Sequence, residues 1–153
     1  MVLAPDKIQT VTEGSQGEIL SSKFAEDYPL EILIADDNFV NQKLIERILH
    51  KLGYHTDTVS NGIQAIELFG KKKYNVVLMD VRMPEMDGYE ATQLIRQMSV
   101  EQPYIVAMTA NVMSSDRDEC LNVGMNDFIP KPLCLTDVIN KLKTAYRFCT
   151  HKI

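Results

Sequence analysis

Four short apolar segments of the sequence each end in side chains that could take part in chemistry, namely Asp36 with Asp37, Asp80, Thr109 and Lys131. If these segments are neighbouring parallel strands, their carboxyl ends meet at one rim of the sheet, where open α/β sheets bind ligands. Three carboxylates at one rim would repel each other unless a cation lies among them. Mg²⁺ is a suitable cation, because it binds oxygen, uses few protein carboxylates and keeps several waters. The pattern therefore predicts a Mg²⁺ site built on Asp36, Asp37 and Asp80.

A carboxylate in such a site is suited to accept a phosphoryl group, since aspartate is a known nucleophile in covalent phosphoryl transfer. The transfer itself needs in-line positioning and positive charge around the phosphoryl oxygens. Mg²⁺ and Lys131 would supply that charge, and the Thr109 hydroxyl would donate a hydrogen bond to one of the oxygens. We therefore predict that Asp80 is the acceptor.

Residues 74–88, which contain Asp80, have the pattern of a buried strand followed by a loop. Residues 76–79 form an unbroken apolar run, typical of a strand that is buried on both faces. Pro84 and Gly88 indicate a loop, and a capping box at Asp87 starts the next helix. On this stretch alone, a role for Asp80 as a simple turn cap explains the residues equally well.

Strands and helices alternate five times along the chain. Short apolar segments predict strands, and apolar residues at helical spacing predict helices, with Asn38 as an N-cap and Gly53 as a stop signal. Strands are expected near 30–35, 54–59, 76–80, 104–108 and 127–129, and helices near 39–52, 62–73, 88–98, 116–123 and 135–145. This alternation predicts an α/β fold: a doubly wound, flavodoxin-like, five-stranded parallel sheet of order 2-1-3-4-5 with helices on both faces.

The composition is that of a globular domain: 153 residues, 45% hydrophobic and 24% charged. A net charge of −5 argues against a nucleic-acid surface, which needs a clustered basic face. No apolar run approaches the ~18 residues of a membrane span, and the first residues do not resemble a signal peptide. Cys120, Cys134 and Cys149 are scattered and odd in number, which indicates reduced thiols. We therefore expect a cytoplasmic location, no membrane contact and no zinc site.

The first part of the chain differs from the rest. Residues 1–28 are rich in polar residues with few apolar ones, so we expect a linker or flexible N-terminal tail there. A short docked helix around Ile19 to Phe24 is an alternative for part of it. Residues 29–153 are expected to form the folded domain.

Several short motifs of residues 29–146 together resemble the receiver domains of response regulators in two-component phosphorelays. They are Asp36-Asp37, Asp80, Met83-Pro84, Asp87-Gly88, Thr109-Ala110 and Lys131-Pro132, each at the end of an expected strand or in the loop after it. The segments Asp36-Asp37-Asn38-x-x-Asn41 and Gly124-Met125-Asn126-Asp127 are most similar to receivers attached to hybrid histidine kinases.

The resemblance implies a role for each matching position. Asp80 would take the phosphoryl group from a phosphohistidine, in a domain that catalyses its own phosphotransfer and dephosphorylation. Asp37, Asp80 and the backbone carbonyl of Arg82 would bind Mg²⁺, with Asp36 acting mainly through water. Thr109 and Lys131 would contact the phosphoryl oxygens. Phe128 stands where the family places its switch aromatic, and because it lacks a hydroxyl it cannot form the hydrogen bond of a tyrosine.

The resemblance also implies the partner, which would be a histidine phosphotransfer protein or the dimerisation domain of a histidine kinase. Phe39 and Val40, beside the acid pair, are candidates for its docking surface. The parent protein would be a histidine kinase, and this chain would be its cytosolic part if that kinase is membrane-anchored.

Two other functions are compatible with an acidic rim. A receiver-like interaction module that is never phosphorylated would keep the fold without the chemistry. An aspartyl-phosphate phosphohydrolase of the haloacid-dehalogenase type would need an acid two residues after its nucleophile, and Arg82 stands there instead. Phosphorylation in the presence of Mg²⁺ separates these alternatives.

Overall fold

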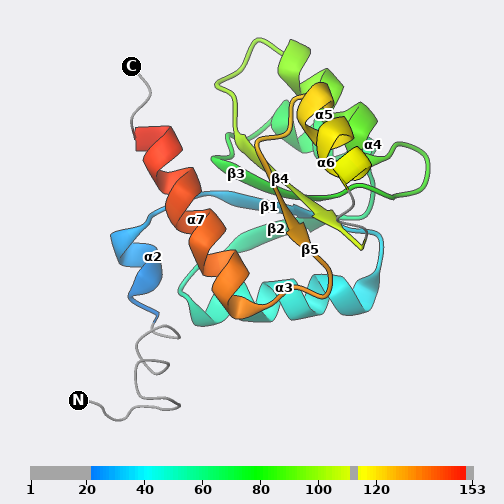
Figure 1. The fold of residues 1–153 in the computed structure, drawn as a ribbon. Coiled ribbons are helices and arrows are strands. Elements are labelled where there is room, and N and C mark those ends of the chain that lie inside the picture. Colours follow the sequence, from blue (N-terminus) through cyan, green and yellow to red (C-terminus); the bar gives the residue numbers. More distant parts are fainter. Residues whose placement is uncertain (1–21, 111–113, 151–153) are drawn as a thin grey trace.

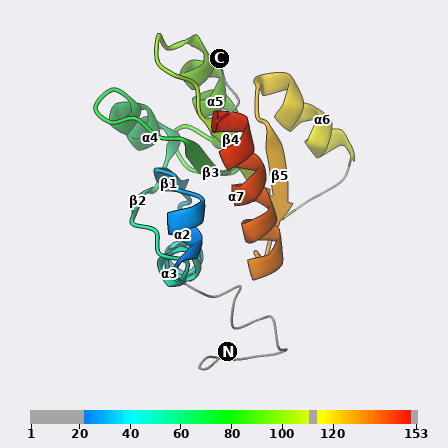
Figure 2. The same ribbon diagram turned by 90° about the vertical axis from the view of Figure 1, so that its left-hand side faces the viewer.

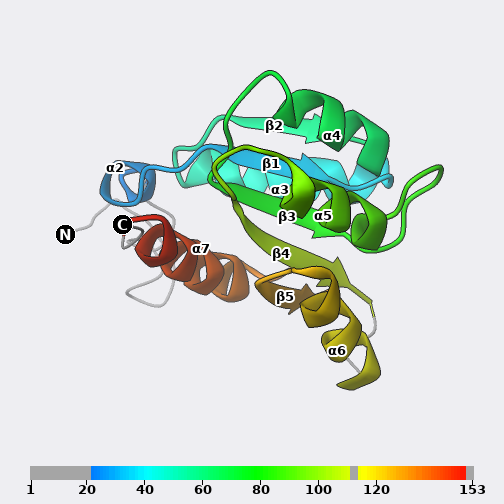
Figure 3. The ribbon, with the colours of Figure 1, turned by 90° about the horizontal axis from the view of Figure 1, so that it is seen from above.

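A computed structural model describes residues 22–110 and 114–150. It confirms the expected α/β fold with a five-stranded, all-parallel sheet of order β2-β1-β3-β4-β5. Figure 3 shows the strands following one another in this order, from β2 at one edge to β5 at the other. The elements in chain order are α2 (Phe24–Asp27), β1 (Ile32–Ala35), α3 (Phe39–Lys51), β2 (Thr56–Val59), α4 (Gly62–Phe69), β3 (Val76–Asp80), α5 (Gly88–Gln97), β4 (Tyr104–Thr109), α6 (Ser114–Val123), β5 (Asp127–Pro130) and α7 (Leu135–Thr150).

The alternation of side chains along the central strands divides the core into two layers. On one face, Ile32 and Ile34 of β1 pack with α3 and α7, while on the other face Leu33 and Ala35 pack with α4, α5 and α6. β1, β3 and β4 are buried along their whole length, as expected for parallel strands covered on both sides (Figure 1). The edge strand β2 is only half-buried at three of its four positions, consistent with its polar sequence.

Local signals of the sequence set the helix starts. Asn38 accepts a hydrogen bond from the Asn41 N–H at 3.0 Å, and Asp87 accepts one from the Glu90 N–H at 2.9 Å. These N-caps satisfy backbone donors that the first turn of a helix leaves without a partner. Both helices therefore begin directly after a segment that carries site residues.

The short helix α2 lies within the range expected to be a linker, and it is seated on the domain beside α3 and α7 (Figure 2). The rings of Phe24 and Tyr28 stack at 4.7 Å, and Tyr28 meets Tyr146 of α7 edge-on at 5.4 Å. The Ala25 N–H donates to the Leu52 carbonyl at the end of α3. Ile19, where the alternative helix was expected to begin, lies outside the described residues.

None of the helices within the described ranges is both long enough and apolar enough to cross a membrane.

Candidate functional site

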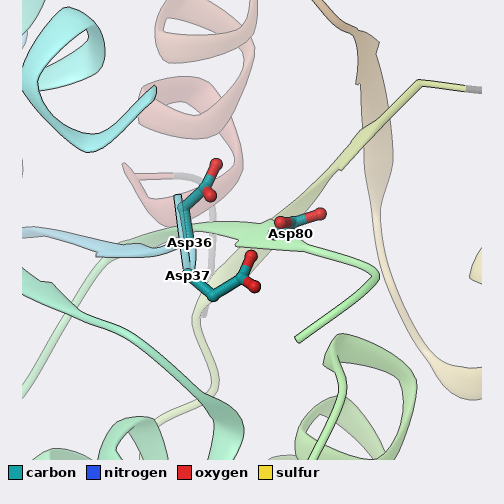
Figure 4. Close-up of side chains that lie close together, drawn as sticks. All are labelled: Asp36, Asp37 and Asp80. Carbon is teal, nitrogen blue, oxygen red and sulfur yellow. The ribbon is translucent and has the colours of Figure 1, made fainter. Parts of the chain in front are cut away.

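The carboxyl ends of β1 and β3 bring three acids together at one rim of the sheet. One carboxylate oxygen from each of Asp36, Asp37 and Asp80 lies within 4.8 Å of the others. Asp36 and Asp37 directly follow β1, and Asp80 is the last residue of β3 (Figure 4). Asp36 and Asp80 are buried, with 0% and 4% exposure, whereas Asp37 is exposed. The cluster expected from the strand ends is therefore present, and its exposed member leaves it accessible from solvent.

Asp80 is held by the loop that follows β3. The Arg82 N–H donates to Asp80 Oδ1 at 3.2 Å, and the Gly88 N–H closes the loop by donating to the Val81 carbonyl at 3.2 Å. A side chain at position 88 would place its Cβ 2.3 Å from the Asp80 carbonyl oxygen, so only glycine fits there. Glu85, in the same loop, has a φ of 69°, a strained conformation for a residue with a side chain. The loop is thus folded tightly against the backbone of Asp80.

Asp36 is anchored through one oxygen and its backbone, while its second oxygen faces the cluster. Its Oδ1 accepts a hydrogen bond from the Asn38 N–H at 2.8 Å, and its own N–H donates to the Val59 carbonyl of β2 at 3.1 Å. Its Oδ2 is buried and accepts no hydrogen bond from any residue that the structure describes. A buried carboxylate oxygen without a donor is unfavourable, unless a cation or an ordered water satisfies it.

Lys131 brings positive charge to the same rim from the end of β5. Its Nζ lies 3.1 Å from Asp80 Oδ2 and 3.5 Å from Asp36 Oδ2. Its backbone N–H donates to the Thr109 carbonyl at 2.8 Å, which ties the ends of β4 and β5 together. One lysine therefore faces two buried carboxylates, and the positive charge of the described cluster is smaller than its negative charge.

The pKa of Asp80 reflects both its burial and the charges around it. The pKa of Asp80 is raised from 3.8 to about 6, mainly by burial and to a smaller extent by the negative charge of Asp36. The Arg82 N–H and Lys131 act in the opposite direction without cancelling the effect of burial on this pKa. A divalent cation would favour the ionised form of Asp80, and a water bound to that cation would donate a hydrogen bond to Asp36 Oδ2. The donor set, all carboxylate oxygens, suits Mg²⁺.

Thr109 and Phe128 lie on the strands next to this cluster. Thr109 is the last residue of β4, is 4% exposed, and lies opposite Pro130 in the register with β5. Phe128 lies opposite Ala107 in the same register and is half-buried in the core layer of α4, α5 and α6. The guanidinium of Arg117 on α6 lies 5.2 Å from the centre of the Phe128 ring.

Phe39 and Val40 form an exposed apolar pair in the first turn of α3. Their exposed fractions are 66% and 72%, high for apolar side chains. They follow Asp36 and Asp37 after one residue, so the pair lies beside the acid cluster. The Lys43 ammonium lies 5.0 Å from the centre of the Phe39 ring.

Gln42 is a buried polar residue next to the site that the sequence patterns do not predict. It is 9% exposed and its amide donates to the Asp36 carbonyl. Its spacing indicates the buried position, because Gln42 lies three residues before Ile45 and seven before Leu49, the other buried residues of α3. Val40 and Leu44, which share the apolar helical pattern, lie on the exposed side instead.

The chain belongs to the family of response regulator receiver domains, whose family model matches residues 32–143. Among curated proteins it is 43% identical over 121 residues to the hybrid signal transduction histidine kinase B of Dictyostelium discoideum, a match that covers 71% of this chain and 6% of that protein. It is 39% identical over 115 residues to the sensor histidine kinase RcsC of Escherichia coli, which covers 75% of this chain and 12% of that kinase. The chain therefore spans only a small part of these curated relatives.

Solved receiver structures match the fold closely. The receiver domain of a sensor histidine kinase from Pseudomonas aeruginosa, crystallised with a magnesium ion coordinated in its active site cleft, aligns with a TM-score of 0.72 and 40% identity, covering 77% of this chain and 98% of that one. The receiver domain of the Saccharomyces cerevisiae response regulator Ssk1, in a complex with the histidine phosphotransfer protein Ypd1, represents a second match with a TM-score of 0.74 and 26% identity, covering 78% and 90% of the two chains. These comparisons confirm the resemblance inferred from the motifs.

Proposed function

We propose that this domain accepts a phosphoryl group from a phosphohistidine onto Asp80 and changes conformation in response. The observation that carries the proposal is the buried acid cluster of Asp36, Asp37 and Asp80 with Lys131 at its edge. A carboxylate oxygen of Asp80 attacks the phosphorus, the bond between phosphorus and the histidine nitrogen breaks, and the nitrogen keeps the electron pair and takes up a proton. Attack of water on the phosphorus later releases inorganic phosphate and regenerates the Asp80 carboxylate, so the domain catalyses its own dephosphorylation.

Asp37, Asp80 and the Arg82 carbonyl would hold Mg²⁺, with Asp36 acting through water. When bound, the ion supplies positive charge for the phosphoryl oxygens. Two observations support this assignment, because both indicate that the site lacks positive charge. Asp36 Oδ2 accepts no hydrogen bond from the described residues and shares the Lys131 ammonium with Asp80, and the pKa of Asp80 is raised. The magnesium ion in the Pseudomonas receiver supports it as well.

The switch would run through Thr109, Lys131 and Phe128. Phosphorylation adds about one further negative charge and strong acceptor oxygens at Asp80. A hydrogen bond from Thr109 to such an oxygen contributes about 1.5–3 kcal/mol, while a full population shift from 1:99 to 99:1 needs about 5.5 kcal/mol. Thr109 therefore needs the charge of Lys131 as well, and the hydrogen bond between their backbones favours a joint movement of β4 and β5. Phe128 follows with β5 by changing its packing, since it has no hydroxyl.

The phosphodonor would be a histidine phosphotransfer protein or the dimerisation domain of a histidine kinase. The complex of Ypd1 with the Ssk1 receiver supports a partner of this kind. The exposed pair of Phe39 and Val40 suits its docking, because apolar side chains close to the acceptor can be covered by a partner helix. We further propose that the parent protein is a hybrid histidine kinase and that this domain works in the cytoplasm. The described cysteines, Cys120, Cys134 and Cys149, form no disulfide with one another, which suits a reducing compartment.

An unphosphorylated interaction module remains the competing function. It is disfavoured by the cost of keeping two acids buried around one lysine, which serves no purpose without a ligand. A phosphohydrolase of the haloacid-dehalogenase type is disfavoured by Arg82, which cannot act as the general acid.

The proposal is tested by incubation with acetyl phosphate and Mg²⁺, followed by intact-mass measurement. We expect the mass of one phosphoryl group to be added, and no addition when a chelator removes Mg²⁺. Asp80→Asn should abolish the addition, while the matched control Asp57→Asn, which changes an acid on β2 that contacts a different lysine, should retain it. An unmodified wild-type chain, or a label that persists in the Asp80→Asn variant, contradicts the proposal.

The docking surface is tested separately by Val40→Asp with phosphorylated histidine phosphotransfer protein as the donor. We expect transfer to slow by about tenfold or more, because the charge must be desolvated in the interface, while phosphorylation by acetyl phosphate stays unchanged. Leu121→Asp is the matched control, since Leu121 on α6 is also exposed, at 59%, and lies outside the pair. Equal transfer rates for wild type and Val40→Asp would remove the first turn of α3 from the interface.

A further inference from the structure

Gln42 is a buried polar residue of α3 that contacts the backbone of the acid pair. Its Nε2 donates to the Asp36 carbonyl at 2.5 Å and lies 3.3 Å from the Ser60 hydroxyl oxygen. Ser60 directly follows β2, and Asp36 directly follows the neighbouring β1. The amide of Gln42 thus joins the ends of two adjacent strands at the rim where the acids lie.

The Asp36 carbonyl belongs to the peptide plane that links Asp36 to Asp37. Because a peptide unit is planar, its carbonyl oxygen and both flanking Cα atoms keep one relative orientation. A hydrogen bond to that oxygen therefore restrains the direction in which both carboxylates leave the backbone. The preceding peptide is also held, by the hydrogen bond from the Asp36 N–H to the Val59 carbonyl.

We propose that Gln42 is a positioning residue for the metal site, which sets the orientation of the Asp36–Asp37 peptide and so the affinity for Mg²⁺. It touches neither the carboxylate oxygens nor the phosphoryl group; it acts through the backbone. Partners of metal ligands that act in this indirect way typically change metal affinity 10–100-fold when removed. The proposal rests on the proposed function, because it assigns Gln42 a role in binding the ion that the reaction requires.

Gln42 also links the site to the proposed docking surface. It lies in the same first turn of α3 as Phe39 and Val40, with its side chain buried while theirs are exposed. A partner that binds the exposed side of this turn would therefore contact the same helical turn of α3 whose buried side orients the acid pair.

The test compares three variants by isothermal titration calorimetry with MgCl₂ alone. Gln42→Leu keeps the approximate volume and removes the donor, and we expect its dissociation constant for Mg²⁺ to rise about tenfold. Ser60→Ala removes only the second partner of Gln42, and we expect a rise of about threefold or less. Gln64→Ala is the control: its oxygen accepts from the Ser60 N–H at 2.7 Å without reaching Asp36, so the dissociation constant should stay unchanged.

A second measurement separates positioning from a merely structural role. Phosphorylation by acetyl phosphate is followed at rising Mg²⁺ concentration, together with the thermal midpoint of each variant without metal. We expect the rate of Gln42→Leu to return to within about twofold of wild type at saturating Mg²⁺, because only the affinity is changed. If Gln42→Leu does not fold, Gln42→Asn, whose shorter amide cannot hold both partners, replaces it.

Each remaining outcome overturns the inference. An unchanged dissociation constant in Gln42→Leu shows that the amide does not position the site. A rate that stays low at saturating Mg²⁺, together with a lowered thermal midpoint, shows a role in folding only. If wild type binds Mg²⁺ and takes up the phosphoryl group while Gln42→Leu behaves identically, the inference fails and the proposed function stands; if wild type does neither, both fail.

Discussion

Among the clusters of the described residues that combine an aspartate with a lysine, the one at the rim of the sheet and the one at its edge strand differ in almost every physical respect. At the rim of the sheet, the buried Asp80 lies 3.1 Å from Lys131 and shares that lysine with Asp36. At the edge strand β2, Asp57 lies 3.0 Å from Lys72 and 2.6 Å from the Tyr74 hydroxyl, with 41% of its side chain exposed. Burial raises the pKa of Asp80 to about 6, whereas the hydrogen bonds from Tyr74 and then Lys72 lower the pKa of Asp57.

The comparison shows that the same residue types can form a satisfied cluster or a reactive one. Asp57 has donors for its charge and remains partly hydrated, so it stabilises the fold in its ionised form. Asp80 has lost most of its hydration and competes with Asp36 for one lysine, so its ionised form is less favourable than that of Asp57 until further positive charge arrives. This is the condition that a metal-dependent acceptor requires, and it distinguishes Asp80 from Asp57.

The largest difference in stability between the two clusters is expected when the lysine of each cluster is replaced in turn. Lys131→Met leaves two buried carboxylates without their cation, and we expect the free energy of unfolding at pH 7 without Mg²⁺ to fall by about 3 kcal/mol. Lys72→Met should change it very little, because the Lys72 amine is exposed and its partners remain hydrated. Urea denaturation of both variants measures the two values, and equal losses would show that the two clusters do not differ as described.

The pH dependence of stability should have opposite signs for the two acids. Folded Asp80 binds a proton between its ordinary pKa of 3.8 and about 6, where the unfolded chain has already lost it. Without Mg²⁺, the stability of wild type relative to Asp80→Asn should therefore fall as pH rises through this window, by up to about 3 kcal/mol. Asp57 has a lowered pKa, so the stability of wild type relative to Asp57→Asn should be present above about pH 4 and be lost as pH falls further.

Urea denaturation at several pH values between 3 and 7, without Mg²⁺, checks both signs in the same experiment. Saturating Mg²⁺ serves as the control, because an ion bound by ionised Asp80 should remove the fall in the stability of wild type with rising pH. A difference in the free energy of unfolding between wild type and Asp80→Asn that does not change with pH would contradict the raised pKa of Asp80.

A smaller effect than that of Lys131→Met is expected for Tyr74→Phe, which tests how far the Tyr74 hydroxyl stabilises the cluster around Asp57. The ring stays in the core, and only the hydroxyl that donates to Asp57 is lost, so we expect about 1 kcal/mol less stability. The pKa of Asp57 should rise toward its ordinary value, which nuclear magnetic resonance titration of the carboxyl measures. Phosphoryl uptake from acetyl phosphate should stay at the wild-type level, and a reduced uptake would show that the edge of the sheet is coupled to the rim.

Much of the fold follows from local patterns. The apolar run before Asp80, the N-caps at Asn38 and Asp87 and the alternation of strands with helices predict the element order and the parallel sheet, and the structure confirms these. The strand ends in turn place Asp36, Asp37, Asp80 and Lys131 at one rim, which needs topology but no side-chain detail.

Local patterns predict less reliably which face of a helix is buried. Apolar residues at helical spacing in α3 include the exposed Val40 and Leu44, while the buried position among them is taken by Gln42. Polarity alone predicts the reverse, because a buried glutamine is favourable only with partners, and its partners Asp36 and Ser60 come from other parts of the chain. The seating of α2 on α3 and α7 similarly depends on contacts with distant aromatic residues.

The sequence by itself determined which residue types stand at the carboxyl ends of the strands, since strand and helix periods and capping residues act over a few neighbouring positions. Only the tertiary structure decided that one oxygen of Asp36 accepts no hydrogen bond from the described residues, that Lys131 is shared between two acids and that the pKa of Asp80 rises. These properties depend on distances between strands and on the water excluded by packing. Electrostatic energies change steeply with both, and neither is encoded in any single segment of the chain.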